Sequence, residues 1–214
     1  MSEYSIAPFY DLLLFPFVHR LRRHILRLCL ERDYSSVLDV CCGTGNQLKM
    51  LKRHGFQVQG VDLSPEMLQI SQRGKYVPPC RFEDAGKMSF PDGSFPVAMT
   101  TFALHEKGQD VSRAILGEMQ RVVEPEGELI LVDFHFTDHT SPLSKSVITM
   151  IEKSAGGEHY ANFLDYTASG GVPGLIGETD LELISLDTVG MGGVGIFLFK
   201  NTRETPSHHG ASRL

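Results

Sequence analysis

The sequence predicts an α/β fold, with a seven-stranded, mostly parallel sheet, helices on both faces and an antiparallel C-terminal hairpin strand. Three observations predict it. From residue 36 to residue 134, short apolar segments alternate with amphipathic segments of helical length. The last two extended segments lie too close together for a parallel crossover. With 214 residues, the chain can form one domain with a sizeable core.

Five segments have the short, apolar character of buried strands, and they are residues 36–40, 57–62, 80–83, 97–104 and 128–134. Helical segments lie between them, at residues 47–54, 65–73 and 110–123. The second helix has a good start, because Ser64 suits the N-cap and Pro65 suits the first turn. The third is expected to bury the residues that recur on one face, which are Val111, Ile115, Met119 and Val122.

The last third of the chain departs from this alternation. Residues 141–155 and 158–168 are expected to form helices. Residues 181–189 and 195–200 are expected to pair as an antiparallel hairpin, because only a short glycine-rich segment separates them.

The expected organisation is a single domain over residues 1–200. Residues 1–32 are expected to form an N-terminal helical lid, and residues 136–178 form an insert between the fifth strand and the hairpin. The polar residues 201–214 are expected to be a disordered tail.

Charge and cysteine content exclude several classes of protein. The net charge is −6 at pH 7, which argues against a nucleic acid partner. The four cysteines form no C-x-x-C pair, so neither a disulfide framework nor a zinc ribbon is expected, and a cytoplasmic location fits best. No secretory signal is recognisable, and the apolar run over residues 12–18 is far shorter than the ~20 residues that span a bilayer.

The most informative segment is the glycine-rich loop at the end of the first strand. Gly43 and Gly45 let the backbone turn sharply and approach a ligand, and the helix that follows offers free N–H groups. The alternative is a strand–helix turn that needs glycine only for its own geometry.

Three acids lie at the ends of three successive strands, Asp39 and Asp62 within their last residues and Asp84 just after the third. Asp39 could meet an ammonium group, Asp62 could accept the hydroxyls of a ribose, and Asp84 could accept from an exocyclic amine. Each acid alone could be a helix cap or a solvated carboxylate. Because the carboxyl ends of parallel strands share one edge of the sheet, the three together favour a ligand site.

These residues also carry a resemblance to a known family. Residues 38–45, 60–68, 90–95 and 118–129 resemble the motifs of class I S-adenosylmethionine-dependent methyltransferases. Within that superfamily, the sequence is most similar to ubiquinone/menaquinone-type and phospholipid-methyltransferase-like enzymes. It departs from the pattern at Cys41, where the family usually has glycine, and at Pro96, where it often has Asp.

The resemblance implies a Rossmann-like fold and S-adenosyl-L-methionine as cofactor, with S-adenosyl-L-homocysteine as product. It also implies which residues bind the cofactor, namely Tyr10, Asp39, Cys41, Gly43, Gly45, Asp62, Leu63, Met67, Asp84, Ala85 and Phe102. A competing NAD(P)-dependent oxidoreductase is disfavoured, because Leu48 stands where the third glycine would fall and Asp39 would face a pyrophosphate.

Methyl transfer needs a general base only if the acceptor loses a proton. His105, just after the fourth strand, is the candidate base, and the alternative is that it only hydrogen-bonds a loop. In the insert, Tyr160 and Tyr166 are expected in an acceptor pocket, with His159, Asn162 and Tyr166 on one helical face. The alternative is an amphipathic helix that packs on the sheet edge. No metal is expected.

The sequence therefore predicts an S-adenosylmethionine-dependent methyltransferase with a small, partly apolar acceptor of quinone, lipid-amine or hydroxyl type. The alternative from another class is a non-catalytic protein that binds an S-adenosyl ligand. Residues 7–30 could contact a membrane surface through an apolar helix face with Leu21, Ile25 and Leu28, or that face could cover the domain.

Overall fold

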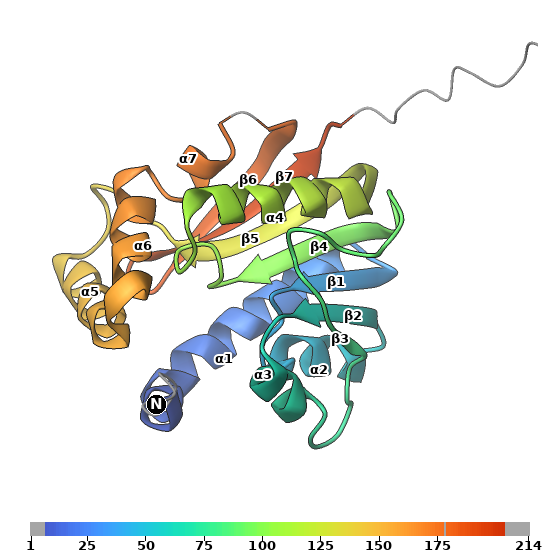
Figure 1. Cartoon of the computed structure of the whole chain (residues 1–214), viewed down its shortest axis with the longest axis horizontal. Helices are drawn as coiled ribbons and strands as arrows, with labels where there is room; N and C mark the ends of the chain where they lie inside the picture. Colours follow the sequence, from blue (N-terminus) through green and yellow to red (C-terminus); the bar gives the residue numbers. More distant parts are fainter. Residues whose placement is uncertain (1–6, 178, 204–214) are drawn as a thin grey trace, which may run out of the picture.

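The computed structural model describes residues 7–177 and 179–203, and within residues 7–15 it describes only the backbone. Seven strands form one sheet in the order β3-β2-β1-β4-β5-β7-β6 (Figure 1). They are β1 (Ser36–Val40), β2 (Gln57–Asp62), β3 (Cys80–Phe82), β4 (Phe95–Thr101), β5 (Val123–Phe134), β6 (Leu181–Val189) and β7 (Val194–Asn201). The first five strands are parallel, and β7 is antiparallel to both β5 and β6, so the predicted fold class is confirmed.

The helices are α1 (Ala7–Glu31), α2 (Asn46–Arg53), α3 (Pro65–Ser71), α4 (Gln109–Val122), α5 (Pro142–Ala155), α6 (Gly157–Ala168) and α7 (Val172–Leu175). Successive side chains of a strand point to opposite faces of the sheet. Leu38 therefore packs with residues of α4 and α7, whereas its neighbour Val37 packs with residues of α1 and α2. Apolar side chains on both faces explain why the central strands have no polar alternation.

Several sequence-based boundaries change. The fourth strand ends at Thr101, because Phe102 has a left-handed backbone (φ 54°), and the fifth begins at Val123. Val111 is 51% exposed, whereas the other three residues of its predicted face are buried. It lies in the first turn of α4, where it lines a cleft. The short helix α7 was not predicted.

The tail also begins later than predicted. Asn201 is buried at the end of β7, where its Nδ2 donates to the carbonyl oxygens of Gln120, Val123 and Glu124. These contacts join β7 to the C-terminal end of α4 and to the start of β5. Residues 204–214 lie outside the described residues, so the prediction for the rest of the tail stays a prediction.

The N-terminal helix covers the domain. Leu21 and Ile25 of α1 are buried against the sheet, and Leu28 packs beside them. The apolar face that suggested membrane contact over residues 7–30 is therefore already occupied by the core, and that contact stays a prediction. Among the described residues, no helix combines the length and the hydrophobicity that crossing a bilayer requires.

Candidate active site at the carboxyl ends of the strands

The loop between β1 and α2 turns through three left-handed residues. Cys41, Gly43 and Gly45 have φ values of 61°, 52° and 65°. A side chain on Gly45 would also place its Cβ 3.1 Å from atoms of both Pro78 and Ser71. Cys41 adopts a conformation that glycine adopts without strain, which explains the glycine that the family usually has there.

Asp62 fixes this loop from the end of β2. Its two carboxylate oxygens accept hydrogen bonds from the backbone N–H groups of Gly43 (2.7 Å) and Ser64 (2.8 Å). Ser64 in turn caps α3 through Met67 N, as predicted. The carboxylate is therefore rigidly placed, and it faces a cleft of about 480 Å³.

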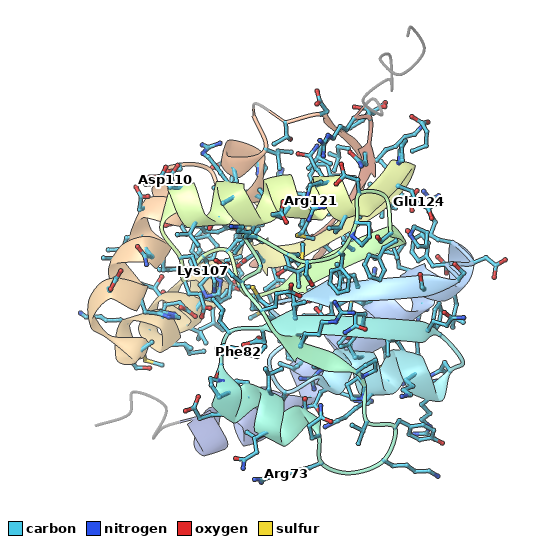
Figure 2. The ribbon with its side chains drawn as sticks, turned by 45° about the vertical axis from the view of Figure 1, so that its right-hand side comes forward. Arg73, Phe82, Lys107, Asp110, Arg121 and Glu124 are labelled. Carbon is cyan, nitrogen blue, oxygen red and sulfur yellow. The ribbon has the colours of Figure 1, made fainter. Side chains whose placement is uncertain are left out.

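This cleft gathers most of the predicted cofactor residues, which are Cys41, Gly43, Asp62, Leu63, Met67, Asp84, Ala85 and Phe102. Gly45 lines no part of it and serves the turn. Tyr10 lies outside the described side chains. Lys107 also lines the cleft, and Figure 2 shows it below the first turn of α4, whereas Arg121 lies toward the far end of that helix.

Asp39, Thr44 and Asn46 line an adjoining space of about 260 Å³. Residues of α1 line the same space and cover it. Burial raises the pKa of Asp39 well above its usual range, the charges of Cys80 and Asp62 raise it further, and Arg22 opposes them. A buried carboxylate of this kind is a suitable partner for a cationic group of a ligand.

We expect Asp39 to make the ligand-free protein less stable as pH rises from about 4 toward neutrality. A carboxyl group whose pKa is higher in the folded chain binds its proton more tightly there, so folding is favoured at the lower pH. Melting temperatures of the wild type and of Asp39→Asn, measured by scanning fluorimetry across this range, check it. The variant should lose less stability, and identical pH profiles would contradict the expectation.

Phe102 separates the cleft from a second, apolar cavity. Phe102 lines the cleft, the space around Asp39 and a cavity of about 430 Å³. Its left-handed backbone is an unfavourable conformation for an aromatic residue, and such conformations cluster at functional sites. Phe102 is thus the wall at which ligands of the two spaces would meet.

The apolar cavity is built from segments far apart in the sequence. Its wall consists of side chains from α1, α5, the β6–β7 turn and the strand ends, such as Phe17, Phe134, Val147, Ile148, Ile151 and Met191. Two ionisable side chains also line it, His105 and Glu152. The cavity therefore suits an apolar molecule that carries a polar group at one end.

His105 is held between two carboxylates. Its Nδ1 lies 2.6 Å from Oδ1 of Asp133, and its Nε2 lies 3.4 Å from Oε2 of Glu152. Burial lowers the pKa of His105, but Asp133 and Glu152 outweigh burial and raise it to about 10. A raised pKa disfavours proton abstraction by His105, whose role as the base stays a prediction.

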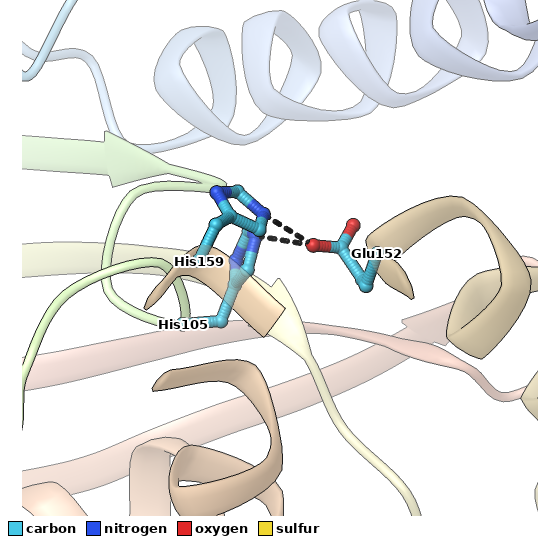
Figure 3. Close-up of side chains that lie close together, drawn as sticks. All are labelled: His105, Glu152 and His159. Atoms are coloured by element: carbon cyan, nitrogen blue, oxygen red, sulfur yellow. Dashed lines mark hydrogen bonds and ion pairs between the residues drawn. The ribbon is translucent and has the colours of Figure 1, made fainter. Parts of the chain in front are cut away.

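Glu152 was not predicted as a site residue from the sequence, although its helical spacing indicates an inward-facing position. It lies at helical spacing from Ser144 and Ile148, so a carboxylate falls on the apolar face of α5. Its Oε2 lies 2.6 Å from Nε2 of His159 (Figure 3). Burial raises the pKa of Glu152, but hydrogen bonds from His105 and His159 lower it to about 2.

The predicted face of α6 does point at this group. His159 and Tyr166 lie beside the ring of His105, with centroids 5.7 and 6.3 Å away, and Asn162 donates to the carbonyl of Glu106. The tyrosines themselves do not line the apolar cavity. Tyr160 stacks on Phe163, and the buried hydroxyl of Tyr166 donates to the carbonyl of Phe134.

We therefore expect Tyr166→Phe to cost about 1 kcal/mol of stability, the net value of one hydrogen bond. Binding of ligands in the cleft should stay within about twofold, because Tyr166 touches neither space. Chemical denaturation and calorimetry measure the two effects. If the variant binds ligands of the cleft much more weakly but is as stable as the wild type, Tyr166 contributes directly to the binding site.

Comparisons with known proteins agree with this geometry. Residues 37–127 match the methyltransferase domain family. The chain is 38% identical over 143 residues to a demethylmenaquinone methyltransferase of Thermus thermophilus, covering 61% of this chain and 63% of that protein. It is 37% identical over 112 residues to a 2-methyl-6-phytyl-1,4-hydroquinone methyltransferase of Synechocystis, covering 49% of this chain and 33% of that protein. The chain thus spans less than two thirds of either relative.

Solved structures share the fold. The magnesium protoporphyrin IX methyltransferase of Synechocystis, solved with bound S-adenosylhomocysteine, aligns with a TM-score of 0.60 at 15% identity, covering 85% of this chain and 82% of that one. A Pyrococcus horikoshii protein aligns with a TM-score of 0.62 at 19% identity, covering 85% and 90%. The alignments show that the chain has the Rossmann-like fold, and the domain match and the two relatives show that residues 37–127 are similar to methyltransferases.

Proposed function

We propose that the protein transfers a methyl group from S-adenosylmethionine to a small, apolar acceptor of the quinol type. The observation that carries the proposal is the position of Phe102, which lines both the polar cleft and the apolar cavity. A donor in the cleft and an acceptor in the cavity would then meet at this residue. Relatives that are named as quinone and quinol methyltransferases support the acceptor class.

The residues of the cleft fit the cofactor. Asp62 would accept from the ribose hydroxyls, since each of its oxygens keeps a lone pair beyond the one used by Gly43 or Ser64. Asp84 and Ala85 would contact the adenine edge, and Leu63 and Met67 its faces.

At the other end of the cofactor, Asp39 would pair with its amino group, with Cys41 and Gly43 close to the methionyl part. That pairing would place a positive charge beside the buried carboxylate of Asp39, in addition to the charge of Arg22.

The cavity fits a ring with an apolar chain. A quinol ring would lie against Phe102 and Phe134, with one oxygen near His105 and Glu152. Leu143, Val147 and Met191 line the cavity and are exposed, so an apolar chain could leave across them. Bound S-adenosylmethionine would supply a methyl group on a good leaving group, and the protein would align the acceptor with it and exclude water.

The non-catalytic alternative predicts an acceptor cavity that is closed or lacks reactive side chains. It is less well supported, because His105 and Glu152 line the apolar cavity. Incubation with methyl-labelled S-adenosylmethionine and a prenylated 1,4-naphthohydroquinone tests the choice. We expect labelled quinol and an equal amount of S-adenosylhomocysteine. If the ligand binds but naphthohydroquinone, phosphatidylethanolamine and catechol acceptors all stay unlabelled, the non-catalytic alternative is supported instead.

A further inference from the structure

Three side chains beside the apolar cavity form an arrangement that methyl transfer by itself does not require. His105 comes from the loop after β4, Glu152 from α5 and His159 from α6 (Figure 3). Each offers one ligand atom, and these three atoms lie within 4.8 Å of one another. We propose that His105, Glu152 and His159 bind a divalent transition-metal ion, with Zn²⁺ as the best fit.

The distances suit a tetrahedral ion. Two ligand atoms that each lie about 2.0–2.1 Å from a tetrahedral Zn²⁺ are about 3.4 Å apart. His105 Nε2 and Glu152 Oε2 are 3.4 Å apart, which already matches this geometry. His159 Nε2 lies 2.6 Å from the same oxygen, so these two atoms would have to separate by less than about 1 Å.

The surrounding groups support the ligands in the way that metal sites require. A histidine ligand usually places its other ring nitrogen against a carboxylate, which fixes the ring and its tautomer. Nδ1 of His105 has Asp133 at hydrogen-bond distance, 2.6 Å, and Nδ1 of His159 has Glu106 at the longer ion-pair distance of 3.8 Å. Asp133 is held in turn, because its Oδ2 accepts from the backbone N–H of Leu104. Both imidazoles thus present Nε2 toward the shared point.

The charge of the site also favours a cation. Asp133 has no exposed surface and Glu152 has 6%, so two carboxylates are buried beside one imidazole. Buried charges need compensation, and a dication supplies two positive charges at the point where the ligands converge. Two imidazoles and one carboxylate favour Zn²⁺, Fe²⁺ or Co²⁺ over Mg²⁺ and Ca²⁺, which prefer oxygen ligands.

The position of the site suggests a role for the ion in activating the acceptor, and this role rests on the proposed function. His105 and Glu152 line the apolar cavity, so the open fourth position would face the acceptor. A hydroxyl oxygen bound there would lose its proton more readily, because a metal ion lowers the pKa of a bound hydroxyl group.

Metal binding by the full chain tests the site without cofactor or acceptor. The protein is stripped with a chelator, titrated with Zn²⁺ by calorimetry and analysed for bound metal, and Co²⁺ is added separately to record its visible absorption. We expect one ion per chain and a Co²⁺ spectrum of a four- or five-coordinate site. Binding of no ion by the folded wild type would overturn the proposal.

Variants locate the ion. Glu152→Gln and His159→Gln should weaken Zn²⁺ binding at least about tenfold, and Asp133→Asn, which removes a positioning group, by about 10- to 100-fold. His139→Gln changes an exposed histidine away from the cluster and is the matched control. Unchanged affinity in His159→Gln would overturn the proposed site. The chain also has two adjacent histidines, His208 and His209, and loss of the ion from a His208→Gln/His209→Gln variant would place the ion there instead.

If a variant of His105, Glu152 or His159 fails to fold, the Co²⁺ spectrum of the wild type still shows whether the folded protein binds an ion in a four- or five-coordinate site. The outcome is also separate from that of the proposed function. Metal binding without transfer to any quinol would reject the function and keep the site. Transfer at an unchanged rate by chelator-treated protein that binds no ion would keep the function and reject the site.

Discussion

Replacement of Asp62 by alanine is expected to weaken S-adenosylhomocysteine binding by roughly 10- to 150-fold, or about 1.5–3 kcal/mol. The variant loses a charged acceptor for the ribose hydroxyls. It also releases the backbone N–H groups of Gly43 and Ser64, which hold the loop in place. Both losses act on the same ligand, so we expect this substitution to have the largest effect on the cleft. Isothermal calorimetry measures it.

Two comparisons separate these contributions. Asp62→Asn keeps one oxygen for the loop and should bind better than Asp62→Ala. Asp138→Ala removes an exposed carboxylate outside the cleft and should bind like the wild type. Unchanged affinity in a folded Asp62→Ala protein would reject the proposed position of the ribose.

Val147→Trp is expected to raise the KM for a quinol acceptor by about tenfold or more, with unchanged affinity for S-adenosylhomocysteine. Val147 lines the apolar cavity, and the indole group would occupy part of its volume of about 430 Å³. An acceptor that needs this space would bind less tightly, whereas the cleft lies on the other side of Phe102. Steady-state kinetics with varied acceptor and calorimetry with the product measure the two effects.

Met150→Trp is the matched control. Met150 lies on the same helix and is 65% exposed, but it does not line the cavity. This variant should keep the wild-type KM. If both tryptophan variants behave alike, or if Val147→Trp weakens the acceptor and S-adenosylhomocysteine equally, the acceptor does not bind in the apolar cavity.

The cofactor-binding residues could be predicted from the sequence, because each is identified by its position relative to a nearby strand or glycine. Asp39, Asp62 and Asp84 each lie at or just after the end of a predicted strand, and parallel strands bring their carboxyl ends to one edge whatever the details of packing. Eight of the eleven predicted cofactor residues line a single cleft, and Asp39 lies in the adjoining space.

Other features depended on the tertiary structure. The left-handed conformation of Phe102 could not be predicted, because nothing in its neighbours requires a positive φ. The role expected for Tyr166 changed for a similar reason. Helical spacing placed it correctly on the face of α6 that points to His105, but the carbonyl that its hydroxyl reaches belongs to β5.

By itself, the sequence determined the order along the chain of the strands and of the helices other than α7, the glycine-rich turn and the row of acids, because short-range periodicity and spacing encode them. Only the tertiary structure decided the acceptor side, where Glu152, His159 and the β6–β7 turn meet His105 and Phe102. These segments have no fixed spacing from the strands. Their meeting is set by how α5 and α6 pack beyond the sheet (Figure 1), and packing is a property of the whole fold.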